Sequence, residues 1–223
     1  MAEIANACAG PFGRFYDFYI ERPRLAQAIG RLVWGIDVAP LYRSMAAIAR
    51  LPEGATVLDV PCGGGVALRA LRPGQRVRWI AVDIDPTMLA RCERRARERG
   101  IEVELLHADM CALPLPDACA DVVLAYSGLH MVGEPRTAVA ELVRCLKPGG
   151  ELIGSTFLAD GARRQRALFD RGERTGRNGP LVPAAELRRW LLDVGIEDVQ
   201  IAPARGFAIF DGRRVDSARP GSS

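Results

Sequence analysis

Short apolar runs alternate with longer segments of mixed polarity between residues 51 and 158. Five of these runs predict strands, because they are rich in apolar and β-branched residues and are bounded by glycine, proline or charged residues. They cover residues 57–60, 76–83, 102–110, 121–125 and 151–157. Strands that alternate with helical segments are typical of a parallel, doubly wound α/β sheet. Two more short strands are expected near Val199 and Phe207.

Several segments between the strands carry the start and stop signals of helices. Residues 86–99 have Asp85 as a candidate N-cap, Pro86 at the first helical position and Gly100 just past the end. A second helix is expected over residues 184–194. A longer helical stretch is expected over residues 24–50, ahead of the first strand.

Residues 57–65, Val-Leu-Asp-Val-Pro-Cys-Gly-Gly-Gly, predict a strand that leads into a loop beneath a ligand. Glycine adopts positive φ and allows a ligand to approach bare backbone. A helix that begins near Val66 would direct unpaired N–H groups and a partial positive charge at an anionic group such as a carboxylate. The segment indicates a nucleotide-type site at the tip of the first strand. A tight turn without a ligand is the alternative.

Two cofactor classes use such a turn. A dinucleotide fingerprint needs G-x-G-x-x-G, and here Gly63 and Gly65 supply the first two glycines while Leu68 stands at the third. The other class is S-adenosylmethionine (SAM), whose loop has the form acid-x-G-x-G-x-G. This chain has Asp59-x-Pro61-x-Gly63-x-Gly65, with proline in place of the first glycine.

Acidic residues end the second and third predicted strands. Asp83 can accept hydrogen bonds from both hydroxyls of a ribose, and Ile84 beside it offers an apolar wall for an adenine face. Asp109 ends the next strand and is suited to accept a bond from the adenine amino group. The fourth strand runs into Tyr126-Ser127-Gly128.

Taken in order, these motifs, with Leu-Lys-Pro-Gly-Gly at residues 146–150, resemble those of class I SAM-dependent methyltransferases. The resemblance covers about residues 51–157, and the core is similar to the family of ubiquinone and menaquinone C-methyltransferases and many small-molecule methyltransferases. It implies a Rossmann-like, seven-stranded sheet with an antiparallel C-terminal hairpin. An Asn/Asp-Pro-Pro-Tyr sequence, found in many relatives that methylate exocyclic amines of nucleic acid or glutamine, is absent after the fourth strand.

The resemblance also implies SAM as the cofactor and S-adenosylhomocysteine as the product. The residues expected to hold them are Asp59, Val60, Pro61, Gly63, Gly65, Asp83, Ile84, Asp109, Met110, Tyr126 and Ser127. Asp59 is expected to support the turn or to reach the cofactor's amino group indirectly.

Catalytic residues are harder to assign, because the sulfonium is already a strong electrophile and positioning can supply much of the acceleration. A base is needed only where the acceptor must lose a proton. His130, just past the fourth strand, is the best-placed titratable group, and Tyr16 is a second candidate. For His130 the alternative is a structural turn, and for Tyr16 it is ordinary packing.

Composition narrows the class of protein. The chain has 223 residues with 49% hydrophobic and 26% charged residues, which fits one soluble α/β domain. No apolar run approaches the roughly 18 residues of a membrane span, and no signal pattern begins the chain, so the cytoplasm is expected. The six cysteines form no C-x-x-C pair, so no metal site is expected. A net charge of +3 is too small to indicate nucleic acid as a partner.

Three regions are expected: a helical N-terminal extension over residues 1–50, a cofactor-binding core from residue 51, and a tail over residues 217–223 that is disordered. An aromatic cluster at residues 12–19 and a glycine-rich connector at residues 159–183 are expected to form lids over the cleft. The aromatic extension favours a flat or lipophilic small-molecule acceptor. The acceptor atom and the oligomeric state stay open. So does the alternative of a catalytically silent, SAM-binding regulatory or interaction protein.

Overall fold

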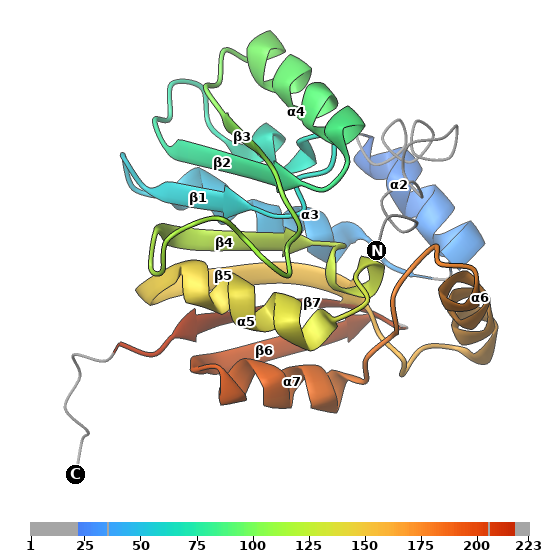
Figure 1. Ribbon diagram of the computed structural model, residues 1–223. Coiled ribbons are helices and arrows are strands. Elements are labelled where there is room, and N and C mark those ends of the chain that lie inside the picture. Colours follow the sequence, from blue (N-terminus) through green and yellow to red (C-terminus); the bar gives the residue numbers. More distant parts are fainter. Residues whose placement is uncertain (1–21, 35, 205, 217–223) are drawn as a thin grey trace.

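The computed structural model describes residues 22–34, 36–204 and 206–216. Seven strands form one sheet in the order β3-β2-β1-β4-β5-β7-β6 (Figure 1). The strands are β1 (Thr56–Asp59), β2 (Arg78–Asp83), β3 (Glu104–His107), β4 (Ala120–Tyr126), β5 (Leu146–Phe157), β6 (Ile196–Ala204) and β7 (Phe207–Arg214). Strands β1 to β5 pair in parallel, whereas β7 is antiparallel to both β5 and β6. The doubly wound sheet and its antiparallel hairpin are therefore confirmed.

Alternate side chains of the central strands enter two apolar clusters, one on each face of the sheet. In β1, Leu58 belongs to one cluster and Val57 to the other. Helices α5 (Pro135–Cys145) and α7 (Ala184–Asp193) cover the Leu58 face, and α4 (Pro86–Glu98) covers the Val57 face. Burial on both faces explains why the parallel strands are continuous apolar runs.

The N-terminal segment forms several short helices where one long helical stretch was expected. It contains α2 (Pro23–Ile29), a π-helical turn (Gly30–Trp34), α3 (Ala39–Met45) and a 3₁₀ turn (Ile48–Arg50). Gly30 lies at the junction of α2 and the π-helical turn, and an added Cβ there would lie 3.1 Å from the Val38 side chain. Ala26, Leu41 and Ile48 are buried in the Val57 cluster, so residues 26–48 cover that face of the sheet together with α4.

The connector after β5 contains a helix that the sequence did not predict. Helix α6 (Arg163–Arg174) fills half of the segment that was expected to be a glycine-rich linker. Leu158, before this helix, and Val182, after it, form an isolated parallel bridge, which closes the connector against the end of β5. The aromatic cluster at residues 12–19 and the predicted tail at residues 217–223 lie outside the described residues.

Helix α4 begins and ends close to the positions that the sequence indicates. Asp85 is its N-cap, since the Asp85 carboxylate accepts hydrogen bonds from Thr87 N at 2.8 Å and from Thr87 Oγ1 at 2.6 Å. Gly100, just past the end, has φ +65°. Among the described residues, no helix is long and apolar enough to cross a membrane.

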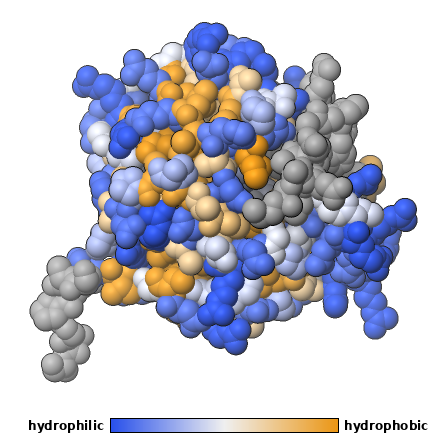
Figure 2. Space-filling model, in the orientation of Figure 1, coloured by the Kyte–Doolittle hydropathy of each residue, from blue (hydrophilic) through white to orange (hydrophobic). Residues whose placement is uncertain are grey.

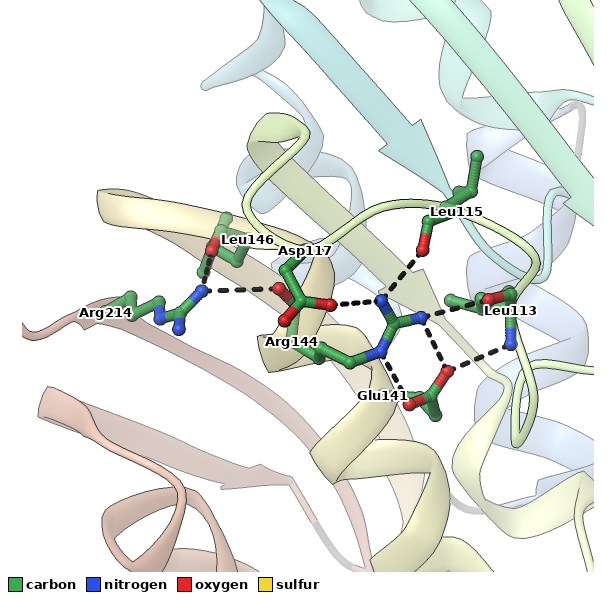
Figure 3. Close-up of polar contacts among 7 residues, drawn as sticks. All are labelled: Leu113, Leu115, Asp117, Glu141, Arg144, Leu146 and Arg214. Atoms are coloured by element: carbon green, nitrogen blue, oxygen red, sulfur yellow. Dashed lines mark hydrogen bonds and ion pairs between the residues drawn. The ribbon is translucent and has the colours of Figure 1, made fainter.

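Arg144, in the last turn of α5, fastens the loop before β4 at the amino end of the sheet (Figure 3). Its guanidinium donates to both carboxylate oxygens of Glu141, to the Asp117 carboxylate at 2.7 Å, and to the carbonyls of Leu113 and Leu115. The Arg144 side chain is only 28% exposed. The two carboxylates hold the pKa of the guanidinium above its ordinary value.

We expect Arg144→Gln to lower the free energy of unfolding by about 2–3 kcal/mol, because glutamine leaves half-buried acceptors without donors. Denaturant unfolding measures the change. The matched control is Arg78→Gln, because Arg78 forms a similar two-pronged pair with Glu104 but both side chains are more than half exposed. That variant should lose clearly less stability than Arg144→Gln, because water screens an exposed ion pair. Equal losses in the two variants would contradict the role given to Arg144.

Candidate functional site

The glycine turn after β1 lies between the ends of β2 and β4. Val60 N donates to the Leu124 carbonyl at 2.9 Å and Cys62 N donates to the Val82 carbonyl at 2.8 Å, so the turn begins as a continuation of the sheet. The peptide bond between Val60 and Pro61 is cis. These bonds place the turn at the carboxyl edge of the parallel strands, where ligands of open α/β sheets bind.

The two glycines that the sequence singled out have different reasons to be glycine. Gly63 has φ +49° and an added Cβ would meet nothing within 4 Å, so the backbone there faces open space. Gly65 has φ +76° and an added Cβ would lie 2.9 Å from Cys92 Sγ, so it is required for both conformation and packing. The open side of Gly63 is where a ligand can approach the main chain.

The prediction of a helix that begins near Val66 is wrong. Residues Val66–Ala70 form only a 3₁₀ helix of 5 residues. Pro73 and Gly74 follow almost at once, and proline disfavours helical backbone at the residue before it, which leaves too few residues for an α-helix. The turn therefore offers its own backbone, without the dipole of a long helix, to a ligand.

Asp83, at the end of β2, is bonded to the glycine turn. Its Oδ2 accepts from Gly63 N at 2.9 Å, and its Oδ1 accepts from Asp85 N at 2.9 Å. Each carboxylate oxygen can accept a second hydrogen bond. Burial, the largest influence, raises the pKa of Asp83. The carboxylate thus holds the turn and keeps one acceptor position on each oxygen.

Asp59, at the end of β1, is a buried carboxylate with an unsatisfied oxygen. The residue is 1% exposed, and Oδ2 has no hydrogen-bond partner. Burial, and secondly the negative charge of Asp83, raise the pKa of Asp59 to about 8. A buried carboxyl group without a partner costs free energy unless a ligand supplies one. The site is therefore suited to a cationic group.

The tips of β2 and β3 provide the predicted neighbours of an adenine ring. Ile84 is 41% exposed although it is a large apolar residue, so its side chain is available to a ligand. Asp109 follows β3, and its Oδ1 accepts from Cys111 N at 2.8 Å. Met110 beside it is buried. Because β3 pairs with β2, Asp109 and Ile84 lie on neighbouring strand ends.

The loop after β4 packs directly on the glycine turn. An added Cβ on Gly128 would lie 2.3 Å from Pro61 Cδ, so glycine allows the two loops to meet. Ser127 has φ +57°, and its amide donates to the Ser155 carbonyl at 2.8 Å. The Tyr126 hydroxyl lies 3.3 Å from Ser44 Oγ in α3. The predicted residues of β1 and β4 are thus brought together.

His130 lies further along this loop, in an aromatic environment. It is 6% exposed, its Nδ1 lies 3.3 Å from Thr156 Oγ1, and its ring meets Phe157 and Phe169 edge-on at centroid distances of 5.0 and 5.7 Å. Burial lowers the pKa of His130 to about 4. The imidazole is therefore neutral near pH 7, and its role as a base stays a prediction. Tyr16 lies outside the described residues.

The sequence did not point to Ser44, Thr156 or Phe169, which contact the predicted site residues. Ser44 and Thr156 are small polar residues without a motif. Phe169 lies in α6, and its spacing from Gln165 and Gly172 places all three on one helical face. This helical spacing was the one signal in the sequence that could have predicted α6. It is weak, because only one of the three side chains is apolar.

The geometry defines a Rossmann-like fold with a candidate site at the tips of β1 and β2. Comparisons agree with this class. A family model described as "Methyltransferase domain" matches residues 58–154. Demethylmenaquinone methyltransferase of Thermus thermophilus is 39% identical over 130 residues, 56% of this chain and 57% of that protein. An uncharacterised protein of Mycobacterium tuberculosis is 31% identical over 188 residues, 82% of this chain and 66% of that protein.

A solved structure shares the fold. Phosphoethanolamine N-methyltransferase 2 of Haemonchus contortus, in complex with S-adenosylhomocysteine, gives a TM-score of 0.67 at 14% identity over 78% of this chain and 53% of that chain. Residues 58–154 match the methyltransferase domain model, and the comparisons together support a SAM-dependent methyltransferase. The chain spans less than two thirds of the length of the curated relatives that it matches.

Proposed function

We propose that the protein transfers a methyl group from SAM to a small-molecule acceptor that is aromatic or lipophilic. The observation that carries the cofactor assignment is the buried Oδ2 of Asp59, which has no hydrogen-bond partner, beside the open glycine turn. SAM has a cationic amino group and a carboxylate, so Asp59 would hold the former while the open side of the turn at Gly63 faces the latter.

The remaining contacts follow from the strand tips. Asp83 has an acceptor position left on each oxygen for the two ribose hydroxyls. Ile84 would cover one face of the adenine, and Asp109 would accept from its amino group. Leu68, the residue at the third dinucleotide position, is fully buried in the Val57 cluster and supports the packing of the turn.

The bound cofactor supplies an electrophilic methyl group on a sulfonium, which an acceptor displaces in line. The chain would contribute orientation, because holding two reactants in a reactive geometry removes much of the entropic barrier. Phe157, Phe169 and Phe207 lie together at the carboxyl end of β5, and the ring centroids of Phe169 and Phe207 are 4.7 and 5.1 Å from that of Phe157. This aromatic group, next to His130, supports a flat or lipophilic acceptor.

Calorimetric titration with SAM, S-adenosylhomocysteine and NAD tests the cofactor assignment. We expect both S-adenosyl compounds to bind and NAD not to bind. Labelled SAM offered with a panel of quinones, phenols and aliphatic amines then tests turnover. Binding of NAD in preference to SAM would overturn the proposal.

A catalytically silent SAM-binding protein is the second candidate, and Pro61 favours it because proline replaces the first glycine of the SAM loop. Proline removes one N–H from the turn. Tight binding of SAM without turnover of any acceptor would support this reading. Pro61→Gly is the matched variant, and it should then bind SAM without gaining activity.

We expect α6 and the rest of the connector to gain protection from hydrogen exchange when S-adenosylhomocysteine binds. Lids that open for product release come from the less stable parts of a structure, and the inner face of α6 contacts His130 through Phe169. Hydrogen exchange by mass spectrometry, with and without the ligand, measures the change. Helix α7 is the internal control. Equal protection of the connector with and without the ligand would contradict the hypothesis that the connector is a lid.

A further inference from the structure

Helix α6 and the residues that follow it concentrate positive charge. Residues 163–177 contain six arginines and two acids, a net charge of +4, whereas the whole chain carries +3. All six arginines are exposed: Arg163, Arg164, Arg166, Arg171, Arg174 and Arg177. This segment is therefore one of the strongly basic stretches of the chain, and all of its arginines are exposed.

The inner face of α6 determines where these arginines point. Gln165 and Gly172 are buried, and Phe169 between them packs on Phe157. These three positions share one face of the helix, so the face opposite carries Arg163, Arg171 and Arg174 away from the sheet. The arginines are held outward by the packing of the helix.

The arginines of α6 are not held in ion pairs with other described residues. Within the part of the chain that the structure describes, none of the six arginines forms an ion pair. Helix α4 is different, because its exposed Arg94 and Arg97 pair with Glu98 at 3.9 Å and Glu93 at 3.1 Å. A helix that presents unpaired arginines outward is available to a partner with negative charge.

An exposed leucine lies among these arginines. Leu168 is 52% exposed, one turn from both Arg164 and Arg171. In Figure 1, α6 lies at the end of the molecule to which the parallel strands point, and Figure 2 shows a hydrophilic surface at that position. A phosphate backbone would use the arginines alone, whereas an anionic bilayer offers negative headgroups and an apolar boundary for the leucine.

We propose that the exposed side of α6, with Leu168 at its edge beside Arg164 and Arg171, docks on the surface of an anionic lipid bilayer. The docking itself does not depend on the proposed function. Only its consequence for how the acceptor reaches the site rests on that function. Phe169, on the inner face, contacts His130 and Phe157, so docking would hold the acceptor side of the cleft near the bilayer. A lipophilic acceptor could then enter from the membrane without crossing water.

Vesicle co-sedimentation of the full-length protein tests the docking. The probes are phosphatidylcholine vesicles with and without phosphatidylglycerol, at low and at physiological ionic strength. We expect binding only to the anionic vesicles, weakened by salt. Arg171→Gln with Arg174→Gln should reduce partitioning roughly 30-fold, at about five-fold for each basic residue near an anionic surface. Arg163→Gln with Arg164→Gln repeats the test on the first turn.

The matched control is Arg94→Gln with Arg97→Gln on α4, which removes the same charge from another exposed helix and should leave partitioning within about two-fold. An equal loss in the α4 control, equal binding to neutral vesicles, or no binding at low salt would overturn the docking. Tighter binding to a DNA duplex that depends on Arg171 and Arg174 would also overturn it. The assay requires neither SAM nor turnover, so its failure is distinguishable from failure of the proposed function.

Discussion

Asp83→Ala is expected to weaken SAM binding by about 1.5–3 kcal/mol, or roughly 10- to 150-fold in Kd. The carboxylate would lose its bonds to the ribose hydroxyls. It would also release Gly63 N, to which Oδ2 is bonded at 2.9 Å, so the turn itself becomes less ordered before the ligand arrives. Calorimetric titration of wild type and variant measures the difference.

Asp85→Ala is the control for Asp83→Ala, because Asp85 is an acid only two residues further along the chain. It caps α4 through Thr87 N, so its loss should lower the free energy of unfolding by about 1 kcal/mol and leave the SAM affinity nearly unchanged. If a folded Asp83→Ala protein binds SAM as tightly as wild type, the ribose contact is excluded.

Much of the fold could be predicted because the strands are buried on both faces. Continuous apolar runs such as that of β4 do not depend on distant contacts to be recognised, and turn residues such as Gly100 end helices through local backbone conformation. The site acids could be located for the same reason. Asp59 and Asp83 come directly at the ends of such runs, and parallel strands place those ends at one edge.

The helix predictions that were wrong concern segments whose local sequence signals are short or mixed. After Gly65 the chain has helix-forming residues, but Pro73 lies too near for an α-helix to develop. Helix α6 buries Gln165 and Gly172 beside Phe169, so its inner face has no apolar period, and its arginines resemble those of a solvated linker. Packing of Phe169 against Phe157 stabilises this helix, and such a contact between distant residues cannot be predicted from the local sequence.

His130 shows a second limit of the sequence. Its position past β4 was correct, but its properties depend on Phe157, Phe169 and Thr156, all of which are distant in the chain. Together they bury the imidazole and lower its pKa to about 4. A strand-tip histidine in water would have an ordinary pKa near 6.5, so position alone predicts a better base than the fold produces.

The binding of SAM is expected to depend on pH through Asp59. Burial and the charge of Asp83 raise the pKa of Asp59 to about 8 in the free protein, so at pH 6 the carboxyl group is protonated. A cationic amino group in the site favours the ionised form, and binding below pH 8 therefore releases a proton. Affinity should rise by up to about ten-fold per pH unit from pH 6 toward pH 8. The rise should level off near pH 8, where an α-amino group with an ordinary pKa of about 7.7–8.0 loses its own proton.

Stability of the free protein should change in the opposite direction. The folded state binds a proton at Asp59 that the unfolded chain, with a pKa near 3.8, does not bind between about pH 4 and pH 8. The contribution of this group to the free energy of unfolding is therefore fully present below about pH 4 and is lost as the pH rises through 8. The raised pKa of Asp83 acts with the same sign.

Asp59→Asn separates these effects, because asparagine has nearly the same shape and does not titrate. The variant should bind SAM more weakly than wild type at pH 8, and its affinity should be nearly flat between pH 6 and pH 8. Calorimetry at pH 7 in two buffers of different ionisation enthalpy counts the protons: about one is expected to be released by wild type and none by the variant. Asp83→Ala should shift the wild-type midpoint to lower pH, since it removes the charge that helps to raise the pKa of Asp59. Proton release that is the same in wild type and Asp59→Asn would mean that another group titrates on binding, and Asp59 would then be only a support for the glycine turn.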